Sequence, residues 1–124
     1  MGIIAKTFQS GQHATISPTT LLSASTAATY LVNYYLYQDT ASTGCSTFPT
    51  VKLELTWNDG FANQNQTTNM ITLGASGTAS LRAEFPAHVA ASTAISYQTS
   101  WGAPVGCSMN GSYAFSIGAA LAQP

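Results

Sequence analysis

Charged side chains are scarce in this sequence. They make up 6% of its 124 residues, against about 25% in a typical globular protein. A net charge of −1 cannot supply the basic surface that attracts a phosphate backbone or an anionic membrane. We therefore expect no nucleic-acid partner and no membrane insertion. The charged residues are Lys6, Asp39, Lys52, Glu54, Asp59, Arg82 and Glu84.

Long apolar runs and helical periodicity are also missing. No run approaches the roughly 18 residues of a transmembrane helix. The one helix-like segment, HVAASTAI (88–95), is short and is expected to be a loop entering a strand. The opening MGIIAKTFQSGQ has too short an apolar stretch for a signal peptide. The neutral, hydroxyl- and amide-rich composition favours a virion or extracellular location.

Residues that carry chemistry are few. The chain has two cysteines, Cys45 and Cys107, and two histidines, His13 and His88, with no further soft ligand at a zinc-like spacing. His88 is expected at the opposite end of the fold from both cysteines, which excludes a Cys–His nucleophile pair. The four acids form no evident pair for glycoside hydrolysis. We predict a non-enzymatic protein without cofactor or metal.

The sequence does contain patterns that are typical of β-strands. Short apolar alternating segments recur between Gly, Pro, Asn and Ser punctuation, near 3–9, 12–17, 29–38, 50–58, 68–74, 78–85, 93–101 and 110–121. This pattern predicts an all-β fold, a single antiparallel jelly-roll-like β-sandwich of about eight strands. Residues 1–124 form one domain, in which 1–17 is an N-terminal strand or arm that a neighbouring copy could exchange.

Two segments show one apolar and one polar face. In TVKLELTWNDG (50–60), Val51, Leu53, Leu55 and Trp57 alternate with polar residues. SLRAEF (80–85) repeats the pattern and places Arg82 and Glu84 outside. These charges are expected on solvated faces, where they aid solubility and strand register.

Two other segments lack a solvated face. In TYLVNYYLYQD (29–39) both faces are apolar or aromatic apart from Asn33, and in GSYAFSIGAAL (111–121) the second face carries only small uncharged residues. Small residues let another backbone approach closely. We therefore predict that copies of the chain cover one another. The predicted oligomer-interface residues are Tyr30, Tyr34, Tyr35, Tyr37, Tyr113, Phe115 and Ile117.

Cys45 and Cys107 fall in loops that alternating strands would place at the same end of the sandwich. We predict a disulfide between them, which would contribute about 4 kcal/mol through the unfolded state. Free thiols are the alternative.

The segment NDGFANQNQ (58–66) is rich in side-chain oxygens. Its Asn-Asp-Gly start is typical of a turn, and a weak calcium or sugar site is the alternative. Calcium sites usually hold several carboxylates, and only one is present here. Aromatic rings could stack on a sugar while amides bond its hydroxyls. The candidate ligand-binding residues are Trp57, Asn58, Asp59, Phe61 and Asn63.

The order of these features resembles a known superfamily. A strand of the form ATYLVNYYL (28–36) follows the lead-in ISPTTLLS (16–23), and an aromatic-alternating strand ends near the C-terminus. This is similar to the jelly roll of the C1q/tumour-necrosis-factor-like superfamily. It also resembles small phage and bacterial β proteins with Tyr-x-Val-x-x-Tyr and Leu-x-Trp-x-Asp-Gly elements, here from Tyr30 to Gly60. The superfamily resemblance implies a compact homotrimer.

The predicted function is therefore structural. We expect a self-associating protein of a phage virion, in capsid decoration or a tail-fibre-like role, or of a bacterial exterior. Its partners would be itself and a capsid or tail protein or a surface glycan. The alternative is a carbohydrate-binding module or lectin that uses Trp57, Phe61 and the Asn/Gln-rich loop.

Overall fold

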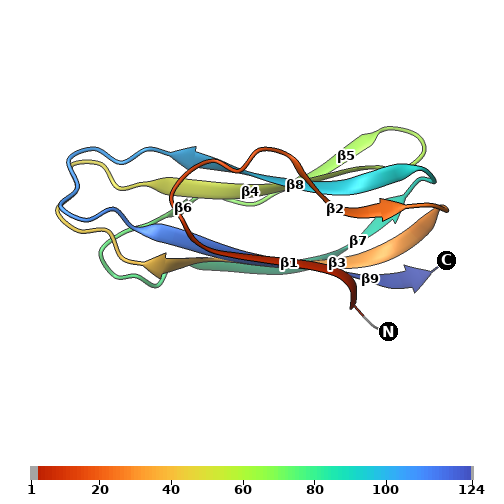
Figure 1. Cartoon of the computed structure of the whole chain (residues 1–124), viewed down its shortest axis with the longest axis horizontal. Helices are drawn as coiled ribbons and strands as arrows, with labels where there is room; N and C mark the ends of the chain where they lie inside the picture. The colour runs from red at the N-terminus through yellow and green to blue at the C-terminus, as the bar shows by residue number, and fades with distance from the viewer. Residues whose placement is uncertain (1–2, 124) are drawn as a thin grey trace.

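The computed structural model describes residues 3–123 and contains nine β-strands in this range (Figure 1). No helix in this part of the chain is long and apolar enough to cross a bilayer. The strands are β1 (Ile3–Gln12), β2 (Thr19–Ala24), β3 (Ala28–Thr40), β4 (Thr50–Asn58), β5 (Asn63–Thr67), β6 (Ile71–Thr72), β7 (Ser80–Val89), β8 (Thr93–Gly102) and β9 (Ser112–Gln123).

The strands form two antiparallel sheets packed face to face (Figure 1). Sheet A has the order β1-β9-β3-β7, and sheet B has the order β2-β8-β4-β5 with β6 also paired to β4. The chain alternates between the sheets from β1 to β4 and again from β7 to β9, which is the connectivity of a jelly roll. The predicted all-β antiparallel sandwich is confirmed.

The core forms because side chains alternate along each strand. In β4, Val51, Leu53 and Leu55 are fully buried, while the residues between them face outward. Trp57 is half-buried, and its ring stacks on Phe85 of β7 with 5.4 Å between centroids. This ring pair joins the two sheets at the β7 side of the sandwich.

Five of the seven residues predicted for an oligomer interface lie in this core instead. The two middle strands of sheet A, β3 and β9, turn these side chains toward sheet B, where each is at most 8% exposed. Because their own chain already covers them, they offer no surface to a neighbouring copy, and the interface prediction is wrong for them. They are Tyr30, Tyr34, Tyr113, Phe115 and Ile117.

The predicted strand at 12–17 is also wrong. Residues 13–18 form an irregular crossover between the sheets, and the strand follows at Thr19–Ala24. The crossover is held by hydrogen bonds to β8 rather than by a ladder. The Ile16 amide donates to the Thr99 hydroxyl at 2.8 Å, and the Trp101 amide donates to the Thr15 hydroxyl at 3.0 Å.

A buried hydroxyl relay connects this crossover to the core. Thr99 Oγ1 lies 2.7 Å from the Tyr113 hydroxyl, which donates to the Ala14 carbonyl at 2.6 Å. Because Thr99 Oγ1 accepts from the Ile16 amide, its own proton is free for Tyr113. Burial raises the pKa of Tyr113 above 10.0, so the phenol stays protonated and can serve as the donor.

Replacing Tyr113 by Phe removes the donor to Ala14 while keeping the ring. We expect the free energy of unfolding to fall by about 1–2 kcal/mol, the usual cost of losing a partly buried hydrogen bond. Tyr37→Phe is the matched control, because that ring lies on the outer side of β3. Urea unfolding of both variants measures the difference, and equal midpoints would contradict the relay.

Candidate functional site

The outer face of sheet A carries an aromatic row. Strand register places Phe8 of β1, Ser116 of β9, Tyr35 of β3 and Arg82 of β7 side by side. Tyr35 stacks on Tyr37 with 4.7 Å between ring centroids, and the Arg82 guanidinium lies 5.0 Å from the Tyr35 centroid. Phe8 is 59% exposed. The row therefore presents aromatic surface outward with a single cation.

The next row of the same face is polar at its ends. Lys6 of β1, Gly118 of β9, Asn33 of β3 and Glu84 of β7 are register partners. A Cβ on Gly118 would lie 3.2 Å from the Asn33 amide group, so the glycine leaves room for that side chain. Lys6 and Glu84 are both exposed, and they lie at opposite edges of the sheet.

A stripe of small residues therefore runs along β9 between taller neighbours. Two surface hollows flank the Asn33 side chain. One, of about 380 Å³, lies over Ser116 and Gly118 beside Lys6 and Phe8. The other, of about 460 Å³, lies between β3 and β7. The residues of the stripe on this side of β9 are Ala114, Ser116, Gly118 and Ala120, of which Ser116 is half-buried and the other three are buried.

The outer face of sheet B is different in character. Its middle carries Glu54, which accepts a short hydrogen bond from Gln98 and one of 3.1 Å from Thr67. Hydroxyls and amides surround this carboxylate. A hollow of about 550 Å³ opens at the β4–β5 end of this face, lined by Thr56, Trp57, Asn58, Asn63, Gln64, Asn65, Thr93 and Ala94. The outer face of sheet B is therefore polar, whereas the outer face of sheet A exposes aromatic and aliphatic side chains such as Phe8 and Ile4.

Three of the five candidate ligand-binding residues line the polar hollow. They are Trp57, Asn58 and Asn63, and the two amides bond each other at 3.0 Å. Asp59 and Phe61 are not among its lining residues. Phe61 stands 96% exposed in the β4–β5 turn. One ring of the expected sugar platform is therefore almost fully exposed and does not line the hollow.

Asp59 belongs to the turn itself. Its carboxylate accepts from the backbone amides of Phe61 and Ala62, each at 2.8 Å, and from the Gln64 side chain at 2.9 Å. The Ala62 and Phe61 amides hold the pKa of Asp59 below 3.8. A carboxylate with these bonds organises the hairpin, as the turn interpretation predicted.

The remaining titratable residues do not gather into a site. No group of three His, Cys, Asp or Glu side chains that could hold a metal occurs among residues 3–123. His88 Nδ1 lies 3.0 Å from the Thr29 hydroxyl on the outer side of sheet A, and His13 is exposed in the crossover. Asp39 accepts from the Gly11 amide at 2.7 Å and from Ser112, which links the ends of three strands.

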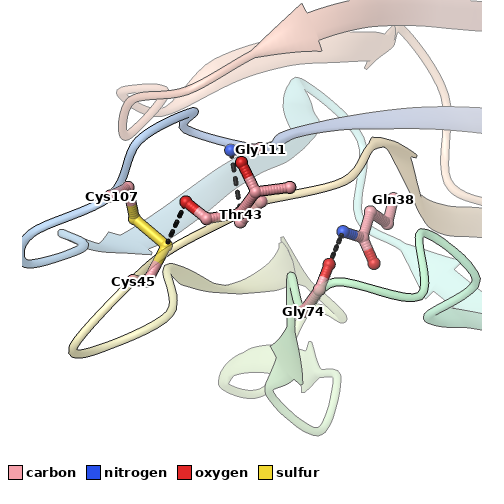
Figure 2. The surroundings of a disulfide bond; sticks show 7 residues. Gln38, Thr43, Cys45, Gly74, Cys107 and Gly111 are labelled. Atoms are coloured by element: carbon pink, nitrogen blue, oxygen red, sulfur yellow. Dashed lines mark hydrogen bonds between the residues drawn. A yellow bond between two sulfur atoms is a disulfide. The ribbon is translucent and has the colours of Figure 1, made fainter.

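Cys45 and Cys107 form a disulfide, so the pairing prediction is confirmed and the free-thiol alternative is not. The two loops that carry them run antiparallel as an arm at one end of the sandwich (Figures 1 and 2). Thr43 pairs with Met109 and Thr47 pairs with Val105. The cysteines lie midway between these two bridges.

The arm has an internal symmetry that the sequence analysis missed. Each loop contains Gly-Cys-Ser, in TGCST (43–47) and VGCSM (105–109). Both glycines have positive φ, and a Cβ on Gly44 or Gly106 would meet Ser108 or Ser46 at 2.5–3.0 Å. The repeated tripeptide is therefore the signal for a two-stranded arm with a disulfide at its centre.

No protein-family model matches the chain, and no curated protein matches it either.

The disulfide closes a loop across a sequence separation of 62 residues. Replacing both cysteines, Cys45→Ser with Cys107→Ser, should lower the free energy of unfolding by about 4 kcal/mol. Guanidinium unfolding with and without reductant measures this change. The wild type in reductant should match the variant, which reductant should leave unchanged. A variant as stable as the oxidised wild type would contradict the prediction.

Proposed function

We propose that this protein is a non-enzymatic structural or adhesion protein that associates with copies of itself through the outer face of sheet A. The observation that carries the proposal is the contrast between the two outer faces. Sheet B presents hydroxyls, amides and the hydrogen-bonded Glu54. Sheet A presents Phe8, the stacked Tyr35 and Tyr37, and the hollow over Ser116 and Gly118.

The energetics favour covering this face. Phe8 is 59% and Ile4 is 53% exposed on β1, and burying what remains of each side chain would contribute about 1–2 kcal/mol per residue. Tyr35 and Tyr37 are partly buried, so each keeps a smaller ring surface that association could bury. Lys6, Arg82 and Glu84 lie on the same face, but the apolar surface between them is still exposed, and association would remove it from water.

An exterior setting fits these features. A disulfide persists in oxidising surroundings and is rare in cytosolic proteins, so Cys45–Cys107 is compatible with an extracellular location. Jelly rolls occur in viral capsid proteins and in lectins, although a fold alone does not define a function. We propose a virion surface or a bacterial exterior as the setting.

Self-association is tested by sedimentation of the oxidised protein at micromolar concentration. We expect a mass that is a multiple of the 12.9 kDa chain and a shift toward monomer in the variant Phe8→Ser. Phe61→Ser is the matched control, because that ring is exposed in the β4–β5 turn and outside the proposed interface. A wild type that sediments as a single chain would contradict the proposal.

Glycan binding is the second candidate, and the 550 Å³ hollow on sheet B favours it. Its lining is neutral and rich in amides and hydroxyls, which suits a sugar, and its volume falls within the usual range for small-ligand sites. The ring of Trp57 is engaged with Phe85 on the core side. A sugar here would therefore rely on amides more than on stacking.

A glycan array separates the two candidates. If the hollow binds a sugar, Asn65→Ala should abolish the signal, because Asn65 is exposed and lines the hollow. Asn110→Ala is the control, since that exposed amide lies in the disulfide-linked loop region at the other end. Binding unaffected by Asn65→Ala, or no binding to any glycan, would reject this candidate.

A further inference from the structure

We infer that two copies of this chain pair face to face through the outer face of sheet A. Their two-fold axis lies between the two copies, runs parallel to the strands, and passes over the boundary between β9 and β3. This inference rests on the proposed self-association and specifies its geometry. It follows from the cross-strand rows, which place small and large side chains in adjacent columns and opposite charges at opposite edges.

The first argument is shape. Sheet A has the order β1-β9-β3-β7, so rotation about such an axis lays β9 of one copy over β3 of the other. The hollow over Ser116, beside Lys6 and Phe8, then receives the partner's Tyr35, the register neighbour of Ser116 within one chain. Ala114 and Gly118 on either side of Ser116 are already covered by their own chain. A hollow over β9 beside a ring on β3 becomes self-complementary under this rotation, and isologous contacts require self-complementarity.

The second argument is charge. The same rotation lays β1 over the partner's β7, so Lys6 faces the partner's Glu84, and the symmetry repeats this contact once. Both residues belong to the row that contains Gly118 and Asn33. Within one chain they are three strand spacings apart, about 14 Å. This exceeds the Debye length of about 8 Å at physiological salt, so they interact strongly only between copies.

The same operation places Phe8 beside the partner's Arg82. In one chain this guanidinium already lies over Tyr35, and an incoming Phe8 would cover it from the other copy. The exposed phenylalanine on β1 and the exposed arginine on β7 thus become neighbours. Packed sheets tolerate a relative rotation of about 30°, and the long Lys6, Arg82 and Glu84 side chains can absorb it.

Edge-to-edge pairing of two β1 strands is the competing arrangement. It would leave Glu84 on β7, at the far edge of sheet A, without any role. The superfamily resemblance implied a three-fold assembly. Three-fold symmetry does not bring Lys6 of one copy opposite Glu84 of another and Glu84 of the first opposite Lys6 of that same copy. Glu84 therefore distinguishes the two-fold face from both alternatives.

The test is a charge swap measured by sedimentation equilibrium. Lys6→Glu and Glu84→Lys should each weaken association about tenfold or more, because each places like charges at two symmetric contacts. The double variant should restore the wild-type dissociation constant to within about threefold. Lys52→Glu, on the outer face of sheet B, is the control and should change nothing. Near-ultraviolet circular dichroism verifies that each variant is folded.

The outcomes are separable. A two-chain species weakened by each single reversal and restored by the double reversal supports the inference. An associated wild type that ignores Glu84→Lys, a double variant weaker than either single one, or a three-chain mass would overturn the two-fold geometry alone. A monomeric wild type would overturn both the geometry and the proposed function.

Discussion

The alternation of side chains along β3 and β9 is the constraint on which the rest of this structure depends. These two strands lie in the middle of sheet A, so each has a neighbour on both sides and two faces that need a cover. Sheet B covers one face, which takes Val32, Leu36 and Phe115 completely out of water. The other face keeps Tyr35 and Tyr37 only partly buried beside a column of small residues. The proposed association is a consequence of this second face.

The two ends of the sandwich are held by different interactions. One end carries the disulfide-linked arm, in which Gly44 and Gly106 let two loops approach each other closely. Near its base, the Gln38 side chain donates to the Gly74 carbonyl at 2.7 Å (Figure 2). The Gly111 amide donates to the Ser42 hydroxyl at 2.8 Å. The other end is the polar β4–β5 hairpin, organised by Asp59. Covalent closure thus stiffens one end, while hydrogen bonds alone shape the other.

Sequence periodicity was sufficient for the fold class, since a period of two marks strands wherever one face is apolar. It placed β4 and β7 closely and grouped the side chains of β3 correctly into two faces. It could not say which face is inward when both are apolar, because that depends on which strand is covered by the opposite sheet. For this reason Tyr30, Tyr34 and Tyr113 were assigned to an interface although they form the core.

Other features of the structure were harder to predict from the sequence. Strand β5 (NQNQT) has no apolar face, so periodicity could not find it, and only its pairing with β4 defines it. The crossover at 13–18 alternates like a strand but is tied to β8 by isolated hydrogen bonds. The paired Gly-Cys-Ser tripeptides were visible in the sequence and would have supported the disulfide. The proposed role of Phe8 and Lys6 in association depends on the strand register, which places them beside Ser116 and Gly118 of β9.

The central claim, that another copy covers the outer face of sheet A, is tested most directly by hydroxyl-radical footprinting over a range of protein concentrations. Phe61, almost fully exposed in the β4–β5 turn, provides an internal reference for radical dose. The account predicts that oxidation of Phe8, Tyr35 and Tyr37 falls relative to Phe61 as the concentration rises. Ratios that stay constant from dilute to concentrated protein would contradict it.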